Sequence, residues 1–288
     1  MVQPVNGVTT REVDNLAELV STVVSIGEDA AKGEEQGGAD LWFRGVTSHD
    51  YSLKPKIYRS SEKYLFAANN DGKKIINDLE PKMISRFTER SAPHLEPYAD
   101  SADSWSMLFV MQHYGAATRL LDWTENLLVA AHFAAGYGRI AKEGDYPAVW
   151  VLQPRLWNKL SFDYVDDAPR VFTPGDDELE SISPRAGRGI QRMPTKQPAA
   201  IYSKYNNVRI IAQQGVFTIS GSDTRGMDEQ IEESLRQGRA SGLELVKIIH
   251  RGGHRALQNE LDLVGASPST IFPGLQSVCK ELDRMVLP

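Results

Sequence analysis

The chain has little cysteine and no long apolar run, and both absences restrict what it can be. Cys279 is the single cysteine among 288 residues, so an internal disulfide and a cysteine-rich zinc site are excluded. The longest apolar stretches, Leu127–Ala135 and Ala148–Leu152, fall well short of the ~20 residues that cross a bilayer. Met1–Arg11 lacks the basic stretch and apolar core of a secretory signal. We therefore expect a soluble cytoplasmic protein with no membrane partner.

Several catalytic and nucleotide-binding signatures are also missing. The sequence contains no Walker loop, dinucleotide glycine fingerprint, GxSxG elbow or HExxH zinc motif. His250 and His254 have i,i+4 spacing, but two glycines lie between them, so no metal site is expected. The net charge of −6 disfavours a broad nucleic-acid surface. It remains compatible with a local basic pocket, so a nucleic-acid partner stays open.

The order of apolar patterns predicts the fold class. Helical periodicity and strand character alternate along the chain, and β-branched residues mark the strands. Helices are expected at Thr10–Asp29, Asp78–Arg90, Ser104–Tyr114, Leu127–Tyr137, Gly253–Val264 and Ser269–Val286, and strands at Leu41–Gly45, Thr118–Trp123, Ala148–Leu152, Val208–Ile219 and Leu243–Ile249. This order predicts an α+β fold in which helices flank a mixed or antiparallel central sheet.

No composition shift marks a firm domain boundary. We interpret residues 1–38 as an N-terminal helical segment packed on one domain of residues 39–288. Residues 155–198 carry acidic clusters, glycines and prolines without periodicity, which predicts an irregular insertion in that domain. Structureless connections of this length are uncommon, so the insertion is a candidate for a functional role.

Arg44 is the first polar residue placed where a core is expected to be apolar. It follows Phe43 on a short apolar strand and precedes Gly45. A buried guanidinium is costly unless it is paired, and its planar fork suits a carboxylate or a phosphate. Gly45 would let a backbone or a ligand approach closely. The alternative, with about equal weight, is a structural ion pair between Arg44 and an aspartate.

A second group of polar residues lies between Gln112 and Thr124. It comprises Gln112, His113, Tyr114, Thr118, Arg119, Asp122, Trp123 and Thr124, and Gly115 ends the preceding helix. Strand alternation would put Thr118, Leu120, Asp122 and Thr124 on one face and Arg119, Leu121 and Trp123 on the other. We therefore expect Asp122 within reach of Arg44. So many unlike functional groups favour a ligand or catalytic role over packing alone.

A third group is the pair Gln213 and Gln214, followed by Gly215 within an apolar segment. One side-chain amide aimed into a cavity would explain the pair. A β-bulge with a satisfied buried amide explains it equally well.

These residues resemble the FRG domain family, which takes its name from a phenylalanine/tyrosine–arginine–glycine motif. The matching segments are Leu41–Gly45, YSLKPKIYR at Tyr51–Arg59, QHYGAATRLLDWTENLLVAAHFA at Gln112–Ala134, AVWVLQP at Ala148–Pro154, RIIAQQGVFT at Arg209–Thr218 and TIFPGL at Thr270–Leu275. The resemblance covers roughly residues 40–280. Ala116-Ala117 departs from it, because a Leu/Val-Pro-like pair is expected there.

The motif order is also similar, more weakly, to ADP-ribosyltransferase-like folds. These carry Arg or His before Gly on a first strand, a Ser/Thr-bearing strand that leads into an A-x-x-F-A helix, and a later strand with Glu or Gln. Arg44-Gly45, then Thr118–Thr124 with Ala130–Ala134, then Gln213 and Gln214 fit that outline. Position 214 is glutamine rather than glutamate, so Asp122 is the substitute carboxylate.

This similarity implies a site for NAD as substrate. Arg44 would hold the pyrophosphate, the Gly45 backbone would contact the nicotinamide amide, and Trp123 or Tyr114 would stack on a ring. Asp122, with Gln214, would stabilise the cationic ribose or activate the acceptor, whose identity stays open. Gln112, Thr118, Arg119 and Thr124 are the remaining side chains expected to contact the dinucleotide.

Three hypotheses of function follow. The first is an NAD-dependent ADP-ribosyltransferase-like enzyme that acts as a bacterial toxin or phage-defence effector. The second is a binding module for a nucleotide, an RNA end or a protein, without turnover. The third is an RNA-directed nuclease or phosphotransferase, with His113 as acid/base and Arg44 and Arg119 on a phosphate.

Overall fold

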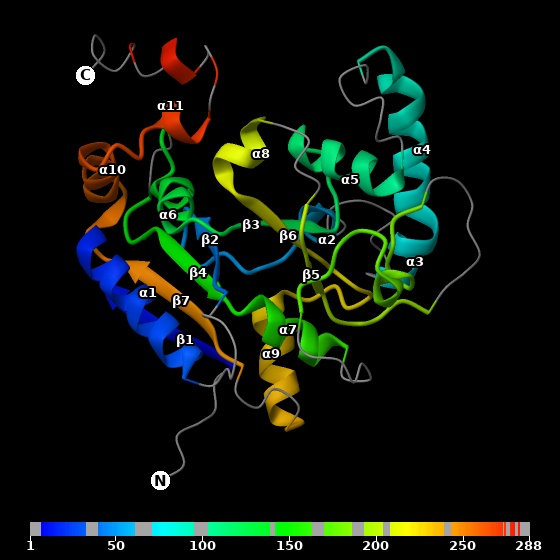
Figure 1. Ribbon diagram of the computed structural model, residues 1–288, viewed down its shortest axis with the longest axis horizontal. Helices are drawn as coiled ribbons and strands as arrows, with labels where there is room; N and C mark the ends of the chain where they lie inside the picture. Colours follow the sequence, from blue (N-terminus) through cyan, green and yellow to red (C-terminus); the bar gives the residue numbers. More distant parts are fainter. Residues whose placement is uncertain are drawn as a thin grey trace.

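The computed structural model in Figure 1 describes most of the chain. The described residues are 7–32, 40–60, 71–94, 103–138, 142–162, 170–185, 193–203, 208–238, 243–272, 274, 277–279 and 282. They form one central sheet with helices on both of its faces (Figure 1).

The sheet is seven-stranded and mixed. In spatial order its strands are β1 (Val8–Val13), β7 (Leu245–His250), β4 (Ala148–Leu152), β2 (Trp42–Val46), β3 (Leu120–Thr124), β6 (Gly215–Ile219) and β5 (Ala199–Ile201). β1 pairs parallel to β7, and every other neighbouring pair is antiparallel. The expected α+β class with a mixed central sheet is confirmed.

The helical segments are distributed along the whole described chain. They are α1 (Leu16–Ala31), α2 (Lys56–Ser60), α3 (Gly72–Lys74), a π-helical turn at Ile75–Leu79, α4 (Glu80–Ser91), a 3₁₀ turn at Ala92–His94, α5 (Ser104–His113), α6 (Leu127–Ala135), α7 (Pro154–Ser161), a 3₁₀ turn at Asp177–Leu179, α8 (Val208–Gln213), α9 (Met227–Arg236), α10 (Gly253–Leu263) and α11 (Pro268–Ile271). None of the described helices is long and apolar enough to cross a membrane.

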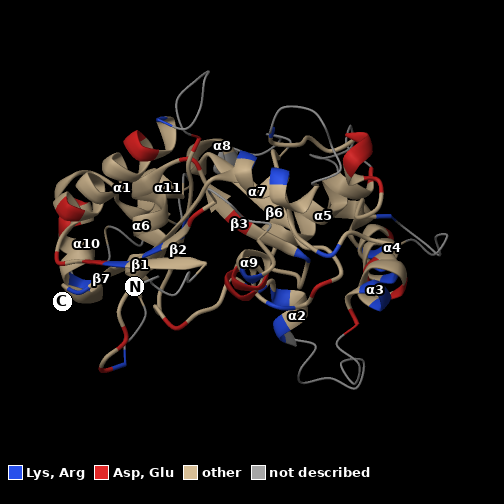
Figure 2. Ribbon diagram, turned by 90° about the horizontal axis from the view of Figure 1, so that it is seen from below, with Lys and Arg blue, Asp and Glu red and all other residues tan. Residues whose placement is uncertain are grey.

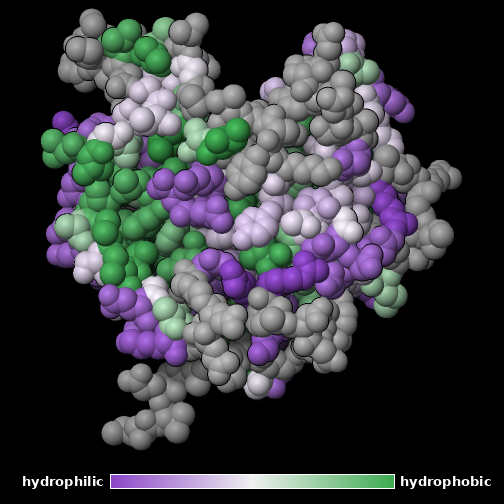
Figure 3. Space-filling model, viewed as in Figure 1, coloured by the Kyte–Doolittle hydropathy of each residue, from purple (hydrophilic) through white to green (hydrophobic). Residues whose placement is uncertain are grey.

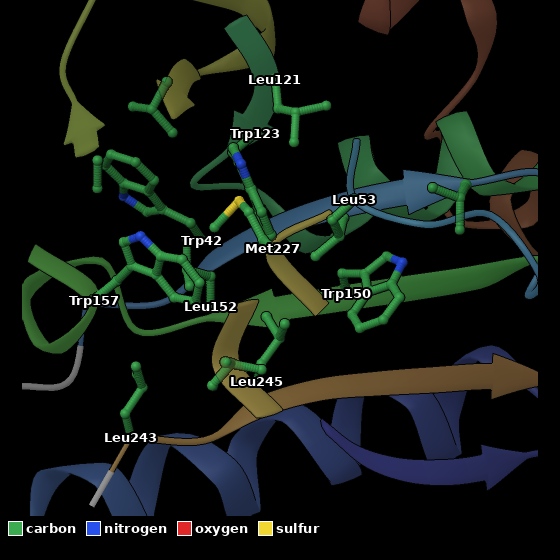
Figure 4. Close-up of a cluster of buried hydrophobic side chains, with 14 of the residues drawn as sticks. Trp42, Leu53, Leu121, Trp123, Trp150, Leu152, Trp157, Met227, Leu243 and Leu245 are labelled. Carbon is green, nitrogen blue, oxygen red and sulfur yellow. The ribbon is translucent and has the colours of Figure 1, made fainter. Parts of the chain in front are cut away.

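The two sheet faces bury different cores. One face carries a cluster rich in tryptophan and leucine, which α7 and α9 help to cover (Figure 4). The opposite face is divided into two clusters. One packs under α1, α6 and α10, and the other packs under α5 over β3, β6 and β5. Strand alternation sorts the residues between the faces: Leu121 and Trp123 join the first, and Leu120 joins the second.

Several predicted elements are confirmed, and others need correction. The helices over Ser104–Tyr114 and Leu127–Tyr137 and the strand Ala148–Leu152 are found as α5, α6 and β4. The helix predicted from Thr10 begins only at Leu16, where Asn15 caps it by accepting from the Glu18 N–H. Val8–Val13 is instead strand β1, because its β-branched residues suit pairing with β7.

The predicted strand Val208–Ile219 was wrong in its first half. Its first six residues form helix α8, and only Gly215–Ile219 form β6. The expected irregular insertion begins with the regular helix α7 and otherwise contains one 3₁₀ turn among its described residues. The predicted final helix is found in part: α11 begins after Ser267, residues 277–279 and 282 are also helical, and much of Ser269–Val286 lies outside the described residues.

Helix α6 lies unusually close to strand β2. A Cβ atom added at Gly45 would lie 1.8 Å from the Ala130 carbonyl oxygen and 2.6 Å from the Ala134 nitrogen. Asn126 starts α6 by accepting from the Leu128 and Val129 N–H groups, and Gly136 ends it in the left-handed conformation. The close approach predicted for Gly45 therefore comes from the backbone of α6.

The surface carries both charge signs and a localised apolar area. Blue and red segments are interspersed over the ribbon in Figure 2, so neither sign gathers on one side of the described chain. Figure 3 shows apolar residues over the side where α1, α6 and α10 lie. Val20 and Val24 of α1 are exposed. The charge distribution agrees with the net charge of −6 in giving no broad cationic face on the described residues.

Replacing Gly45 with alanine is expected to destabilise the fold, because backbone atoms of α6 occupy the position of the new methyl group. We expect the free energy of unfolding to fall by at least about 2 kcal/mol in urea titrations. Gly27→Ala is the matched control. Its Cβ would lie 3.7 Å from Leu41 Cδ1, and alanine at this interior position of α1 should stabilise by about 0.5–1 kcal/mol. Equal stability of the two variants would contradict the packing argument.

Candidate functional site

The candidate site lies where the sheet stops pairing. β2 pairs with β4 along its whole length, from Trp42↔Leu152 to Val46↔Ala148. It pairs with β3 only at Phe43↔Thr124. Beyond that pair the two strands diverge beside Arg44 and Gly45. On one face of the sheet, α6 packs over the part that contains β2, and α5 packs over the part that contains β3. The divergence of the two strands therefore leaves space between these two helices.

Arg44 reaches across this gap. Its Nη1 donates to the Asp122 carbonyl oxygen at 2.5 Å and lies 3.6 Å from Asp122 Oδ2. Alternation puts Arg44 on the face of Trp42 and Val46, whereas Asp122 belongs to the face of Leu120. The contact therefore joins the two sides of the sheet at the gap. The expectation that Asp122 lies within reach of Arg44 is confirmed.

The Arg44 guanidinium keeps unused hydrogen-bonding capacity. Its side chain is 19% exposed, and no acceptor among the described residues bonds its Nε or Nη2. Burial lowers the pKa of Arg44, the Asp122 carboxylate opposes that effect, and the nearby Arg59 cation adds to it. Arginine begins from so high a pKa that the group remains a cation at neutral pH.

Asp122 is held by a short chain of side chains. Gln112 Nε2 donates to both Asp122 carboxylate oxygens, at 3.0 and 2.9 Å. The Thr118 hydroxyl donates to Gln112 Oε1 at 2.5 Å and accepts from the Leu120 N–H. The Asp122 side chain nevertheless stays 59% exposed. Gln112 and Thr118 thus orient a carboxylate that remains open to a ligand.

A cavity of about 250 Å³ adjoins these groups. One part of its wall is aromatic, and the rest carries polar groups. The lining residues are Phe43, Arg44, Gly45, Phe109, Gln112, His113, Asp122, Trp123, Thr124, Val129, Ala130, Phe133, Gln213, Gly215 and Phe217. Apolar walls with a few convergent polar groups are typical of small-molecule sites.

Of the residues expected to contact a ligand, seven line this cavity: Arg44, Gly45, Gln112, His113, Asp122, Trp123 and Thr124. Thr118 acts one step away, through Gln112. The Thr124 hydroxyl already donates to the Gln213 carbonyl oxygen and accepts from the Asn126 N–H. It therefore secures the turn from β3 into α6 and has its hydrogen bonds within the protein.

Arg119 belongs to the core and not to the cavity. Its side chain is fully buried, and it forms a two-pronged ion pair with Glu80 at 2.8 and 2.7 Å. Its remaining nitrogen contacts are to the Ser220 and Ile182 carbonyl oxygens. The expectation that Arg119 contacts the ligand is therefore corrected. A buried guanidinium needs a compensating carboxylate. Glu80, which precedes Arg119 by 39 positions in the chain, provides it.

Neither ring expected to stack on a ligand presents an open face to the cavity, although Trp123 is one of the lining residues. Trp123 is 3% exposed, and its Nε1 donates to the Thr218 hydroxyl within the tryptophan-rich core (Figure 4). Tyr114 is 68% exposed and does not line the cavity. The aromatic wall comes instead from four phenylalanines on different elements, Phe43, Phe109, Phe133 and Phe217. The sequence pattern did not identify them, because isolated phenylalanines on helices and strands are typical of ordinary core residues.

Gln213, and not Gln214, is the glutamine at the cavity. Gln213 ends α8, and its Nε2 donates to the Ile271 carbonyl oxygen at 3.3 Å. Gln214 is exposed at the turn into β6, with a φ of 45°. It is the non-glycine residue with positive φ in the described chain. The strand predicted across both residues is broken here, and Gln214 is not among the residues that line the cavity.

Comparison with protein families supports the resemblance to the FRG domain family. Residues 39–142 match the family model of the FRG domain, so this part of the chain is an FRG domain. The match is shorter than the resemblance over residues 40–280, but it includes Arg44, Gln112, Asp122 and Phe133. No curated protein and no solved structure is significantly similar to the chain.

The two arginines should respond differently to truncation. Arg119→Met leaves the buried Glu80 unpaired, and we expect it to lower the free energy of unfolding by about 3–5 kcal/mol. The double variant Arg119→Met/Glu80→Met removes both charges and should recover much of that loss. Arg44→Met should cost about 1 kcal/mol, because its carboxylate partner is exposed. Urea denaturation measures the free energy of unfolding of all three variants. An equal loss for Arg119→Met and Arg44→Met would contradict the conclusion that, of these two arginines, only Arg119 has a buried ion-pair partner.

Gln214 should tolerate glycine better than its neighbour does. A left-handed residue with a side chain is strained, so Gln214→Gly is expected to leave stability unchanged or raise it by up to about 1 kcal/mol. Gln213→Gly, at a helical position, should lower it by up to about 1 kcal/mol. Thermal unfolding compares the stability of the two variants. A larger loss of stability for Gln214→Gly than for Gln213→Gly would contradict backbone strain at Gln214.

Proposed function

We propose that this FRG-domain chain binds NAD in the cavity between β2 and β3 and cleaves its nicotinamide–ribose bond. One observation carries the proposal: an incompletely bonded guanidinium and a half-exposed carboxylate meet at the edge of a cavity with an aromatic wall. A ligand that satisfies both must carry a negative group, a positive group and a ring. NAD combines an anionic pyrophosphate with a cationic nicotinamide ring.

The dimensions of the cavity favour partial enclosure of such a ligand. Its volume of about 250 Å³ lies just below the ~300–1,000 Å³ of sites that enclose drug-sized molecules. One end of a dinucleotide would therefore enter the cavity, and the remainder would lie outside it. Arg44 sits at the edge of the gap, where its Nε and Nη2, to which no described residue is bonded, can hold a phosphate with two parallel hydrogen bonds.

Cleavage of the nicotinamide–ribose bond is favoured by a carboxylate near the ribose. As the bond between ribose C1′ and the nicotinamide nitrogen breaks, its electron pair passes to the ring, which leaves as neutral nicotinamide. Positive charge then develops on the ribose until the oxygen of water or of an acceptor bonds to C1′ and loses its proton. Asp122 would stabilise that charge, with its orientation maintained by Gln112 and Thr118.

A binding module without turnover is the second candidate. It is supported by the contacts that Asp122 already makes with Arg44 and Gln112, which could serve only to shape the site. An RNA-directed nuclease is less well supported. His113 lines the cavity, but the second phosphate-binding arginine of that hypothesis, Arg119, is sealed against Glu80. The role as a toxin or phage-defence effector belongs to the enzyme proposal and depends on it.

Asp122→Asn should separate catalysis from binding. We expect nicotinamide release from NAD, measured by chromatography, to fall on the order of 10²–10³-fold. Asp29→Asn is the matched control, because Asp29 is an exposed carboxylate of α1 and is paired only with Lys32. Arg44→Met should instead weaken NAD binding, measured by calorimetry, by about tenfold or more.

The outcomes divide the candidates clearly. Wild-type protein that neither binds NAD nor releases nicotinamide would overturn the proposal. Binding without release, unchanged in Asp122→Asn, would favour the binding module. RNA cleavage in the absence of NAD, lost in His113→Ala, would favour the nuclease.

A further inference from the structure

Phe133 differs from the other aromatic residues at the cavity in being open to a ligand. It is 39% exposed, whereas Phe43, Phe109, Phe217 and Trp123 are between 2% and 6% exposed. The buried rings pack against one another or within the core; Phe109 and Phe217, for example, have centroids 5.1 Å apart. Among the described lining residues, Phe133 therefore offers the largest accessible ring surface.

The position of Phe133 is firmly determined. It lies on α6 between Ala130 and Ala134, the two residues whose backbone atoms contact Gly45 most closely. The Phe272 ring packs edge-on to it, at 5.5 Å between centroids and an interplanar angle of 77°. A ring held by a rigid helix and a neighbouring aromatic residue can bind a planar ligand with little loss of side-chain entropy.

We propose that Phe133 is the ring-binding, specificity-determining residue of the site, and that the ring it receives is the cationic nicotinamide of NAD. This inference rests on the proposed function and replaces Trp123 and Tyr114 in the stacking role. The face of an aromatic ring attracts a cation, and the exposed Asp122 carboxylate lines the same cavity. Adenine is neutral and would gain only the stacking contribution. The nicotinamide end therefore occupies the cavity, and the adenosine half lies outside it.

ADP-ribose is the discriminating probe, because it has the pyrophosphate and adenosine of NAD but no nicotinamide. Binding is measured by calorimetry with a carbocyclic, non-cleavable NAD analogue and, separately, with ADP-ribose. We expect Phe133→Ala to weaken binding of the analogue about tenfold and to change ADP-ribose binding less than twofold. Phe133→Tyr should retain the wild-type preference, and Phe133→Leu, which keeps the apolar packing, should behave like the alanine variant.

Tyr114→Ala is the matched control, since it removes an exposed aromatic ring that does not line the cavity. If Phe133→Ala and Phe133→Leu weaken the binding of the NAD analogue and of ADP-ribose equally, Phe133 binds adenine and the inference is overturned. Unchanged binding of the analogue by folded Phe133→Leu would overturn it as well. Failure of the wild-type protein to bind either probe would instead count against the proposed function itself.

The charge part of the inference has its own test. NADH carries a neutral dihydronicotinamide, so the wild-type protein should bind it about tenfold more weakly than the cationic analogue. Asp122→Asn should reduce that preference, whereas Asp29→Asn should leave it intact. Equal affinity of the wild-type protein for NADH and for the cationic analogue would show that ring charge has no part in recognition.

Discussion

The contact between Arg44 and Asp122 is the interaction on which the candidate site depends. It occurs where β2 and β3 have stopped pairing, so a side chain bonds a carbonyl oxygen that a neighbouring strand would otherwise satisfy. A gap in a sheet leaves backbone groups without partners, and those groups must be bonded by something else. A guanidinium can do this with one nitrogen and keep the others available. The same contact therefore closes one edge of the gap and leaves a partly exposed cation beside the cavity.

Two arginines within the FRG-domain match have different surroundings. Arg119 is fully buried, and Glu80 and two carbonyl oxygens account for its hydrogen bonds. Arg44 is partly exposed and faces a carboxylate that solvent also reaches. Arg119 and Glu80 join α4 to the start of β3, and thereby support the strand that carries Asp122. The two guanidinium groups therefore differ in how many of their donors the described residues satisfy.

The parts of the site that could be predicted are those encoded over short distances. Alternation along Leu120–Thr124 separated Asp122 from Trp123, and the apolar, alanine-rich segment after it forms α6 as expected. Long-range partners were not predictable. Nothing near Arg119 identifies Glu80, and nothing near Phe133 identifies Phe272, because these contacts join segments far apart in the chain. The error at Val208–Ile219 has a local cause, since the chain changes from helix to strand at Gln214, which itself adopts the left-handed conformation one position before Gly215.

The sequence by itself determined the α+β class, most of the strands and the FRG motif residues, because periodicity and local composition act within a few residues of each other. Tertiary structure alone decided that Arg44 and Asp122 meet at a gap between β2 and β3, that Arg119 is sealed in the core, and that Phe133 is more exposed than Trp123. The physical reason is that desolvation and pairing depend on which segments surround a side chain. Those neighbours are brought together only when the sheet and its helices have packed.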